Sequence, residues 1–383
     1  MATPEMAFFT GDARSQMDDV LSRLCAELQL NPTRYQRAVQ SYGAVVACLE
    51  ADSSPVASFL PSIYPHGSMA IGTTVKPMGR DEYDLDFVCE FQVSPSAFQS
   101  PLQLLDLIEG CLAAHEVYRS ILERKNRCIR LNYADEFHMD ILPACPEPNS
   151  NNGCVVIPDR QSRWWKPSNP KGFAEWFEKR CAIVLAVMAE RARIQGRAEP
   201  IPPQEAVEYK ATLKRVVQLL KRWRDVHYEK QMELAPISMV LTTLAGDAYE
   251  GQLSVADAMS GILNRVVGLI KSSKPRLYVP NPANPQEDLS EKWDGPGHYA
   301  AFVTGIRELH ERWSALLSTR GIHNASGLLE TLFGEPVKAA IARQAKSLQE
   351  LREKSQLRVS PVGVLTAVPA VGVRMRPNTF HGE

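Results

Sequence analysis

The most informative part of the sequence is Tyr83-Asp84-Leu85-Asp86-Phe87-Val88-Cys89, in which acidic side chains alternate with apolar ones. Side chains two residues apart on a β-strand share a face, so the stretch predicts a strand with Asp84 and Asp86 on one side. Two carboxylates so placed repel each other unless a cation lies between them, and Mg²⁺ prefers oxygen ligands. The pattern therefore indicates a metal site. The alternative is an amphipathic strand with both acids in solvent, begun by Asp81 and Glu82.

A third acid, Asp140, stands alone in the apolar stretch Phe137-His138-Met139-Asp140-Ile141-Leu142-Pro143. Asp135-Glu136 suits a hairpin turn between this predicted strand and another over 128–133. If the strand of Asp140 neighbours the first strand, three carboxylates converge and can hold two metal ions. A basic group paired permanently with Asp140 would contradict this interpretation. His66 and His138 are interpreted as packing or hydrogen-bonding residues.

A glycine-serine turn precedes the acidic pair in the stretch Pro65-His66-Gly67-Ser68-Met69-Ala70-Ile71-Gly72-Thr73. Glycine permits close approach of the backbone to a ligand, and the serine hydroxyl with free amides at a helix start can bind phosphates. Most Gly-Ser pairs are simple turns. Here Ser68 lies 16 residues before Asp84, and the order of extended segment, turn, short helix and acidic strand places phosphates beside metals.

The organisation along the chain changes once, near residue 171. Before it, helices are predicted over 13–30, 32–50 and about 100–118, with strands between them. After it, the candidates are all helical and are interrupted by proline-rich breaks: 171–196, 204–230, 236–250, 254–271, 296–318 and 335–356. An α+β protein of two lobes is therefore predicted, with bounds 1–170 (including the N-terminal helices) and 171–357, followed by an extended tail over 358–383.

Composition excludes several classes of protein. The 43 basic and 44 acidic side chains leave a net charge of −1, so no long nucleic-acid partner is required. The eight cysteines form no Cys-x-x-Cys pair and lie mostly among apolar neighbours, as expected for buried thiols in a reducing compartment. The apolar run from Cys181 to Ala189 is far too short to span a bilayer, and no signal peptide is evident at the N-terminus. A soluble cytoplasmic protein is expected.

Taken together, Gly67-Ser68, Asp84-Leu85-Asp86 and Asp140 resemble the DNA polymerase β-type nucleotidyltransferase superfamily. More narrowly, the flanking residues resemble the bacterial relatives of cyclic GMP–AMP synthase and oligoadenylate synthase, the CD-NTases of CBASS anti-phage defence. The resemblance extends over about 30–320 and includes 165–170, 213–225 and 281–293. It implies a polymerase β-like lobe with a mixed sheet, an oligoadenylate-synthase-like helical lobe, and an active site between them.

The resemblance also implies roles for single residues. Asp84 and Asp86 would ligate both Mg²⁺ ions, with Mn²⁺ able to substitute, and Asp140 the ion nearer the attacking ribose hydroxyl. Gly67 and Ser68 would hold the donor triphosphate. Further candidates for the triphosphate are Lys214, Lys221 and Ser238. The alternatives are a solvated helix face for the lysines, which are seven residues apart, and a helix N-cap for Ser238.

The reaction that the resemblance implies joins nucleoside triphosphates, ATP and GTP, into a cyclic di- or trinucleotide. A monomer is expected, without activation by long DNA, because no zinc-binding insertion is evident. The terminal residues 379–383 are a candidate for conjugation to CBASS regulatory proteins. Two alternatives remain open: a nucleotidyltransferase that acts on RNA ends or small molecules, and an inactive nucleotide-binding sensor or scaffold.

Overall fold

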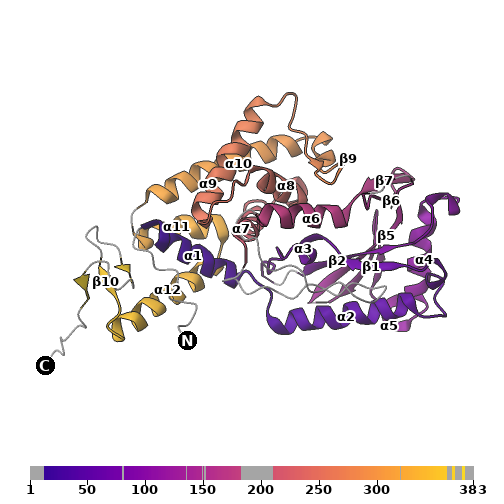
Figure 1. Cartoon of the computed structure of the whole chain (residues 1–383), viewed down its shortest axis with the longest axis horizontal. Helices are drawn as coiled ribbons and strands as arrows, with labels where there is room; N and C mark the ends of the chain where they lie inside the picture. Colours follow the sequence, from indigo (N-terminus) through magenta and orange to yellow (C-terminus); the bar gives the residue numbers. More distant parts are fainter. Residues whose placement is uncertain are drawn as a thin grey trace.

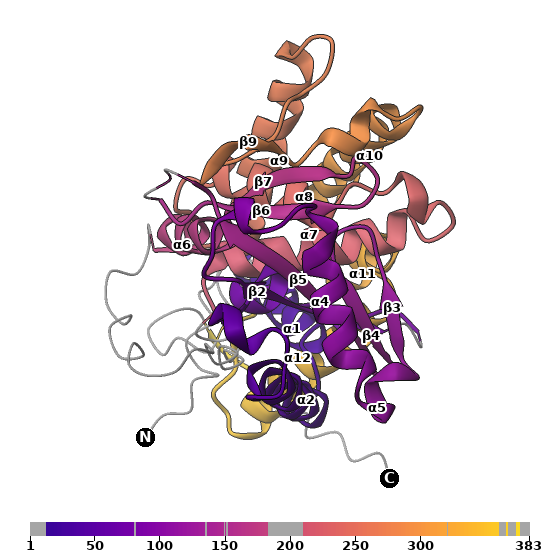
Figure 2. The same ribbon diagram turned by 90° about the vertical axis from the view of Figure 1, so that its right-hand side faces the viewer.

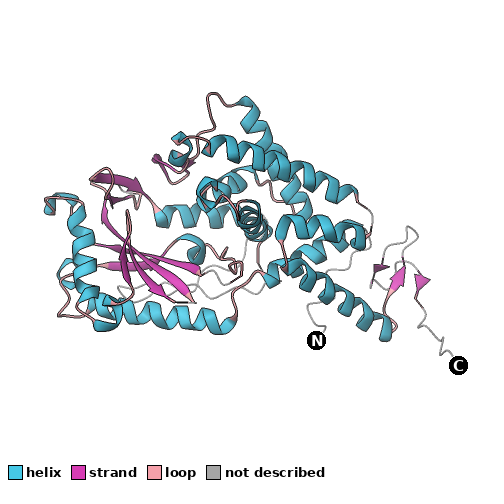
Figure 3. Ribbon diagram, turned by 180° about the vertical axis from the view of Figure 1, so that it is seen from behind, coloured by secondary structure: helices cyan, strands magenta, loops and turns pink. Residues whose placement is uncertain are grey.

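The computed structural model describes residues 13–79, 82–134, 136–148, 150, 152–182, 210–319, 321–359, 365–366 and 373–375. A sheet with flanking helices occupies one end of the molecule, and helices without a large sheet occupy the other (Figures 1 and 3). Within those ranges, no helix combines the length and the apolar character needed to cross a membrane.

The large sheet is mixed and has seven strands: β1 (Ser62–Pro65), β2 (Tyr83–Glu90), β3 (Leu122–Arg124), β4 (Ile129–Tyr133), β5 (Phe137–Pro146), β6 (Val155–Asp159) and β7 (Trp164–Ser168). Its main path runs β1-β2-β5-β4-β3, while β6 pairs with the end of β5 and β7 pairs with β6. β2 and β5 are parallel, and the other pairs are antiparallel. The predicted hairpin between β4 and β5 and the mixed sheet are confirmed.

One face of β2 and β5 is apolar and buried. Leu85, Phe87, Met139 and Ile141 are fully enclosed in a core that includes side chains of α2 (Pro32–Glu50) and α4 (Leu102–Ala113). Figure 2 shows these two helices beside the sheet. Burial of each such side chain contributes about 1.5–3 kcal/mol. A slip of one residue would expose the whole set, so the register is firmly determined. The side chains that alternate with these, including the aspartates, therefore point to the opposite face of the sheet.

The helical part is built around α7. Its helices are α6 (Pro170–Cys181), α7 (Thr212–His227), α8 (Ser238–Ala248), α9 (Val255–Ser272), α10 (His298–Ser318), α11 (Ile322–Phe333) and α12 (Pro336–Glu353). α7 contacts α6, α8, α9 and α11, and Leu213, Val216, Val217 and Leu220 on it are buried. The apolar residues of α7 recur at helical spacing and face this core, while Lys214, Gln218 and Lys221, on the same helix, are buried as well.

The first helix belongs to the helical part, although the sequence analysis grouped it with the sheet. α1 (Ala13–Glu27) contacts α7, α9 and α12, and Val20, Leu21, Leu24 and Cys25 are buried in the same core as α7. An apolar helix face fits any apolar partner of the right shape, so its periodicity does not reveal which lobe it joins. The two lobes are therefore not divided simply at residue 170.

Some expected elements differ in extent, and several other elements were not predicted. The expected helix 100–118 is two helices, α4 and α5 (Glu116–Arg119), and the helix expected from 171 ends at Cys181; residues 183–209, on which the rest of that prediction falls, lie outside the described ranges. Strands β6 and β7, helix α11, and the short hairpin of β8 (Pro280–Asn281) and β9 (Asn284–Asp288) were not predicted. The β8–β9 hairpin lies against β7, where the sheet meets the helical part.

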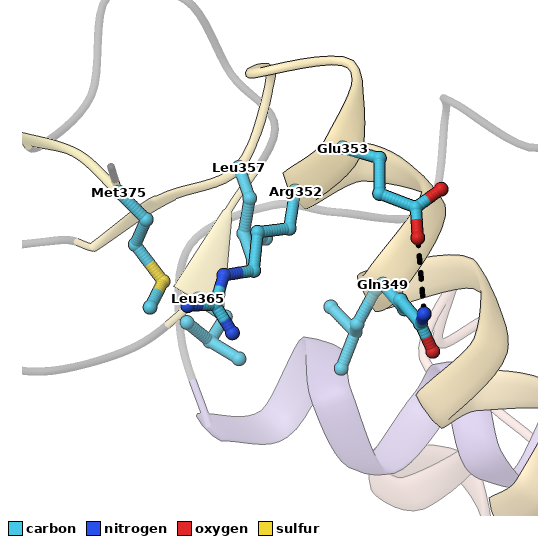
Figure 4. A pocket seen from close by; sticks show the side chains of 7 residues that line it. Gln349, Arg352, Glu353, Leu357, Leu365 and Met375 are labelled. Carbon is cyan, nitrogen blue, oxygen red and sulfur yellow. Dashed lines mark hydrogen bonds between the residues drawn. The ribbon is translucent and has the colours of Figure 1, made fainter. Parts of the chain in front are cut away.

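The described residues of the predicted extended tail form a small sheet. Its strands are β10 (Arg358–Val359), β11 (Leu365–Thr366) and β12 (Val373–Arg374). It lies beyond the end of α12, far from β2 and β5 (Figure 1). Between the small sheet and α12 is an open pocket of about 550 Å³, lined by Leu348, Gln349, Arg352, Glu353, Leu357, Leu365 and Met375 (Figure 4).

Candidate active site

The three candidate metal ligands lie side by side on the polar face of the sheet. In the parallel register of β2 and β5, Asp86 is the direct partner of Asp140, and Asp84 is the partner of His138. Nε2 of His138 is 2.7 Å from a carboxylate oxygen of Glu82, and its Nδ1 is 3.6 Å from Asp84. His138 is thus a hydrogen-bonding residue, as interpreted. The register itself therefore places Asp86 beside Asp140, with Asp84 two residues away on the same face of β2.

The glycine-serine turn lies directly against Asp86. The His66 amide donates to the Asp86 carbonyl at 2.9 Å, which joins the turn to β2. Gly67 begins α3 (Gly67–Ala70) with φ +61°, and a Cβ added to it would lie 2.6 Å from Oδ2 of Asp86. Only glycine accommodates both this backbone conformation and this closeness. The order of elements predicted from the sequence therefore brings the turn and the acidic pair together.

The two candidate lysines approach the turn from α7. Lys221 donates from Nζ to the carbonyl and hydroxyl oxygens of Thr73, at 3.2 and 2.9 Å. Nζ of Lys214 lies 3.5 Å from the Cβ position of Gly72 and forms a 2.7 Å ion pair with Glu178. Both lysines are buried, 8% and 5% exposed respectively. The alternative of a solvated helix face is therefore wrong for both.

Ser238, the last candidate for the triphosphate, begins α8 directly after Ile237, which holds the N-cap position. The interpretation of Ser238 as the cap of that helix is therefore wrong. Its proposed contact with a nucleotide stays a prediction.

An arginine that was not predicted lies among the aspartates. Arg130 on β4 is the cross-strand partner of Asp140, and its Nε and Nη2 donate to the two oxygens of Asp140 at 2.6 and 2.7 Å. Nη2 also reaches Oδ1 of Asp84 at 3.4 Å. In the described part of the chain, no three carboxylate, imidazole or thiolate groups are arranged ready to hold a metal ion. The predicted hairpin could have revealed Arg130, because a turn centred on 135 pairs position 130 with 140.

The electrostatics of this face nevertheless fit a divalent cation. Burial, reinforced by the charges of Asp84 and Asp140, raises the pKa of Asp86 to about 8. Desolvation also raises the pKa of Asp84, although its carboxylate is largely open to solvent, and Arg130 acts in the opposite direction. His66 offers no compensating charge, because burial lowers its pKa to about 4. The three carboxyl groups supply the oxygen donors that Mg²⁺ prefers, and a bound cation would favour their ionised forms. Asp84, Asp86 and Asp140 would hold the ions.

Binding of a divalent cation should depend steeply on pH. A carboxyl group with a pKa of about 8 is largely protonated at neutral pH, so the cation must displace a proton from Asp86. The apparent affinity of the nucleotide-free protein for Mn²⁺ is expected to rise up to tenfold per unit between about pH 6 and 8 and then to level off. Calorimetric titration at several pH values measures this. An affinity that is flat over this window would contradict the expectation, and Asp86→Asn should remove the dependence.

Replacement of Lys221 should weaken triphosphate binding more than replacement of Lys214. Lys221 lies close enough to Asp86 and the turn to interact with phosphates held there, whereas the charge of Lys214 is already paired with Glu178. Lys221→Met is expected to raise KM for the nucleotide roughly 10- to 100-fold, and Lys214→Met less than that. Steady-state kinetics on both variants, with circular dichroism as a folding control, make the comparison. Equal effects would contradict the different roles.

These features define a class of protein. A mixed sheet carries paired acids on neighbouring strands beside a glycine-serine turn, and a helical lobe presents lysines to the turn; this is a nucleotidyltransferase. The Second Messenger Oligonucleotide or Dinucleotide Synthetase domain family matches residues 16–180. A c-di-GMP synthase of Roseivirga ehrenbergii is 33% identical over 98% of this chain and 99% of its own. The chain belongs to this family, the bacterial CD-NTases, which confirms the resemblance seen in the sequence.

Two further comparisons agree. The cyclic dinucleotide synthase CdnG of Bradyrhizobium diazoefficiens is 31% identical, with 87% of this chain and 83% of that protein covered. The structure of the Bradyrhizobium diazoefficiens CD-NTase CdnG in complex with GTP superposes with a TM-score of 0.70 at 26% identity, over 86% of this chain and 99% of that chain. The likeness therefore extends over most of the chain.

Proposed function

We propose that this enzyme is a magnesium-dependent cyclic dinucleotide synthase that condenses two molecules of GTP into cyclic di-GMP. The observation that carries the proposal is the near full-length similarity to a c-di-GMP synthase in a chain that retains all three acids, Asp84, Asp86 and Asp140. The inactive-scaffold alternative is disfavoured because nothing in the acidic set is missing. A relative that binds GTP supports the choice of nucleotide.

The chemistry consists of two equivalent displacements. A ribose hydroxyl of one nucleotide attacks the α-phosphorus of another; a P–O bond forms, the bond to pyrophosphate breaks, and the hydroxyl proton is lost. Repetition with the roles exchanged closes the ring. Divalent ions held by Asp84, Asp86 and Asp140 would acidify the hydroxyl and neutralise charge on the phosphates. The Gly67 backbone and Ser68 hydroxyl would orient the triphosphate, with Lys221 compensating its charge.

Product analysis tests the proposal. The purified protein is incubated with Mg²⁺ and GTP alone, ATP alone, or both, then treated with phosphatase and analysed by chromatography and mass spectrometry. Cyclic di-GMP from GTP alone, unchanged in amount when ATP is added, is expected. A mixed product that requires ATP would overturn the assignment of two guanines but retain the class of reaction. Linear or RNA-linked products would overturn the cyclic dinucleotide synthase.

We infer the cellular role from the same family. The product would serve as a second messenger that activates a separate effector in CBASS anti-phage defence. Nucleoside triphosphate substrates and free cysteines, six of the eight buried, favour the cytoplasm. The chain has no basic surplus, so we propose no long DNA activator. We also propose that the enzyme acts as a monomer. The conjugation peptide at 379–383 lies outside the described residues, and its role stays a prediction.

A further inference from the structure

Arg130 connects the acids of the candidate metal site. Its guanidinium joins acids from two strands, because it donates to both oxygens of Asp140 on β5 and also reaches Asp84 on β2. The pair is not sealed from solvent, since the side chains of Arg130 and Asp140 are 20% and 16% exposed and that of Asp84 is 59% exposed. Solvent reaches all three side chains, most of all Asp84, so a cation that enters from solvent can compete with Arg130 for these oxygens.

A divalent cation and the guanidinium compete for the same oxygens. Mg²⁺ binds carboxylate oxygens at about 2.0–2.1 Å in a strict octahedral geometry. A guanidinium that bridges Asp84 and Asp140 lies where a cation shared by these acids would have to lie, and like charges there would repel strongly. The contact of Nη2 with both acids must therefore be given up when a cation binds.

The sheet offers Arg130 an alternative partner. On β4, Arg130 lies between two cross-strand neighbours, Asp140 on β5 and Glu123 on β3. All three residues belong to the same polar face, because directly paired residues of a sheet project to the same side. Rotation of the side chain away from Asp140 would bring the guanidinium toward Glu123. That carboxylate is already paired with Lys125 at 2.6 Å, so Arg130 would join an existing ion pair there. The movement needs no change in the backbone.

We propose that Arg130 is an internal counter-ion of the metal site, a positioning residue that neutralises Asp140 and Asp84 in the metal-free enzyme and is displaced when divalent cations bind. It keeps the carboxylates in place before substrate arrives and sets a threshold of cation concentration below which the site stays closed. This inference rests on the proposed function only in that the aspartates are taken as the metal ligands. It concerns how readily these aspartates exchange the guanidinium of Arg130 for a divalent cation.

The test measures binding of Mn²⁺ alone, without nucleotide, to the full chain by calorimetry and by the paramagnetic effect of the bound ion. Arg130→Gln should bind Mn²⁺ about tenfold more tightly than the wild type, because no guanidinium has to leave. It should also melt at a lower temperature in EDTA and gain more in melting temperature from Mn²⁺. Arg130→Lys retains the charge without the two-pronged contact, so its Mn²⁺ affinity should lie between those of the wild type and Arg130→Gln. It replaces Arg130→Gln in the test if the glutamine variant folds poorly.

Arg124→Gln is the matched control. Arg124 lies on the neighbouring strand and pairs with two acids, Asp106 and Glu109 of α4, away from the aspartate face; its loss should leave Mn²⁺ affinity unchanged. Unchanged or weaker affinity in Arg130→Gln, while the wild type binds Mn²⁺ and converts GTP, would overturn this inference and leave the proposed function standing. If neither the wild type nor the variant bound Mn²⁺, the metal site, the proposed function and this inference would all be contradicted.

Discussion

Asp86→Asn is expected to reduce synthesis of the cyclic product by about 10³-fold or more, because it removes a negative ligand from the centre of the acidic set. Asp86 is the cross-strand partner of Asp140 and lies against the Gly67 turn, so no neighbouring carboxylate can replace it. An asparagine has nearly the same shape and keeps one oxygen, so a loss of this size would report the charge rather than the packing. Rates of pyrophosphate release measure it.

The same substitution should stabilise the metal-free protein. The folded-state pKa of Asp86 is raised, to about 8, so the folded state holds this proton more tightly than the unfolded state does. The corresponding stability is full below pH about 4 and is lost as the pH rises toward 8, by linkage. Asparagine cannot ionise, so Asp86→Asn is expected to be more stable than wild type by roughly 1–2 kcal/mol at alkaline pH in EDTA.

Thermal unfolding at two pH values checks this. The advantage of Asp86→Asn should grow between about pH 5 and 8 and should shrink when Mg²⁺ is added, because only the wild type gains from the ion. Asp52→Asn, in the exposed turn after α2, is the control and should show neither effect. If Asp86→Asn were active within tenfold of wild type, or less stable than wild type in EDTA, the assignment of Asp86 as a metal ligand would be contradicted.

The parts of the fold that the sequence predicted share a clear physical cause. The first halves of β2 and β5 alternate because one face is fully buried and the other is polar there, so period and register follow from the residues alone. From that register, Asp86 and Asp140 necessarily meet. The long helices α2, α9 and α10 were likewise predicted within a few residues, because each buries a regular apolar stripe.

What the sequence did not predict depends on partners rather than on local pattern. β7 (Trp164–Ser168) carries exposed Trp164, a lysine and a proline, and becomes a strand only because β6 pairs with it. α11 begins with Ile322, but the polar residues His323 and Asn324 that follow conceal its short apolar stripe. The side of the molecule that α1 joins is decided by the shape of the helical core. Such choices belong to tertiary packing, which propensity does not encode.

The residues of the candidate site likewise include some that the sequence predicted and others that it did not. The acids were recognisable because each stands in an otherwise apolar segment, and the glycine-serine turn because of its order and spacing before them. Arg130 was not, because an arginine on a strand is ordinary until its partner across the hairpin is considered. Thr73 is similar: its contact with Lys221 joins the turn to a helix 148 residues away. Residues whose role arises from such distant pairing need a register or a topology before they can be found.

Gly67→Ala tests the closeness of the turn to the acidic set. Two penalties are expected: the left-handed backbone at φ +61°, and a Cβ that would lie 2.6 Å from Oδ2 of Asp86. The first costs about 1 kcal/mol of stability. The second must displace either the turn or the carboxylate, and a displacement near 1 Å in a catalytic arrangement lowers the rate by about 10²-fold. We expect a loss of kcat of this size in a folded protein with impaired Mn²⁺ binding.

Gly79→Ala separates the two penalties. Gly79 has nearly the same backbone conformation, φ +58°, but no atom lies within 4 Å of its Cβ position. Its replacement should therefore cost similar stability and leave activity within a few fold of wild type. If the two variants lost stability equally and only Gly67→Ala lost catalysis, the collision with Asp86 would be the cause. Equal activities would mean that the turn does not act on the acids, and that the phosphate-binding role of Gly67 and Ser68 is wrong.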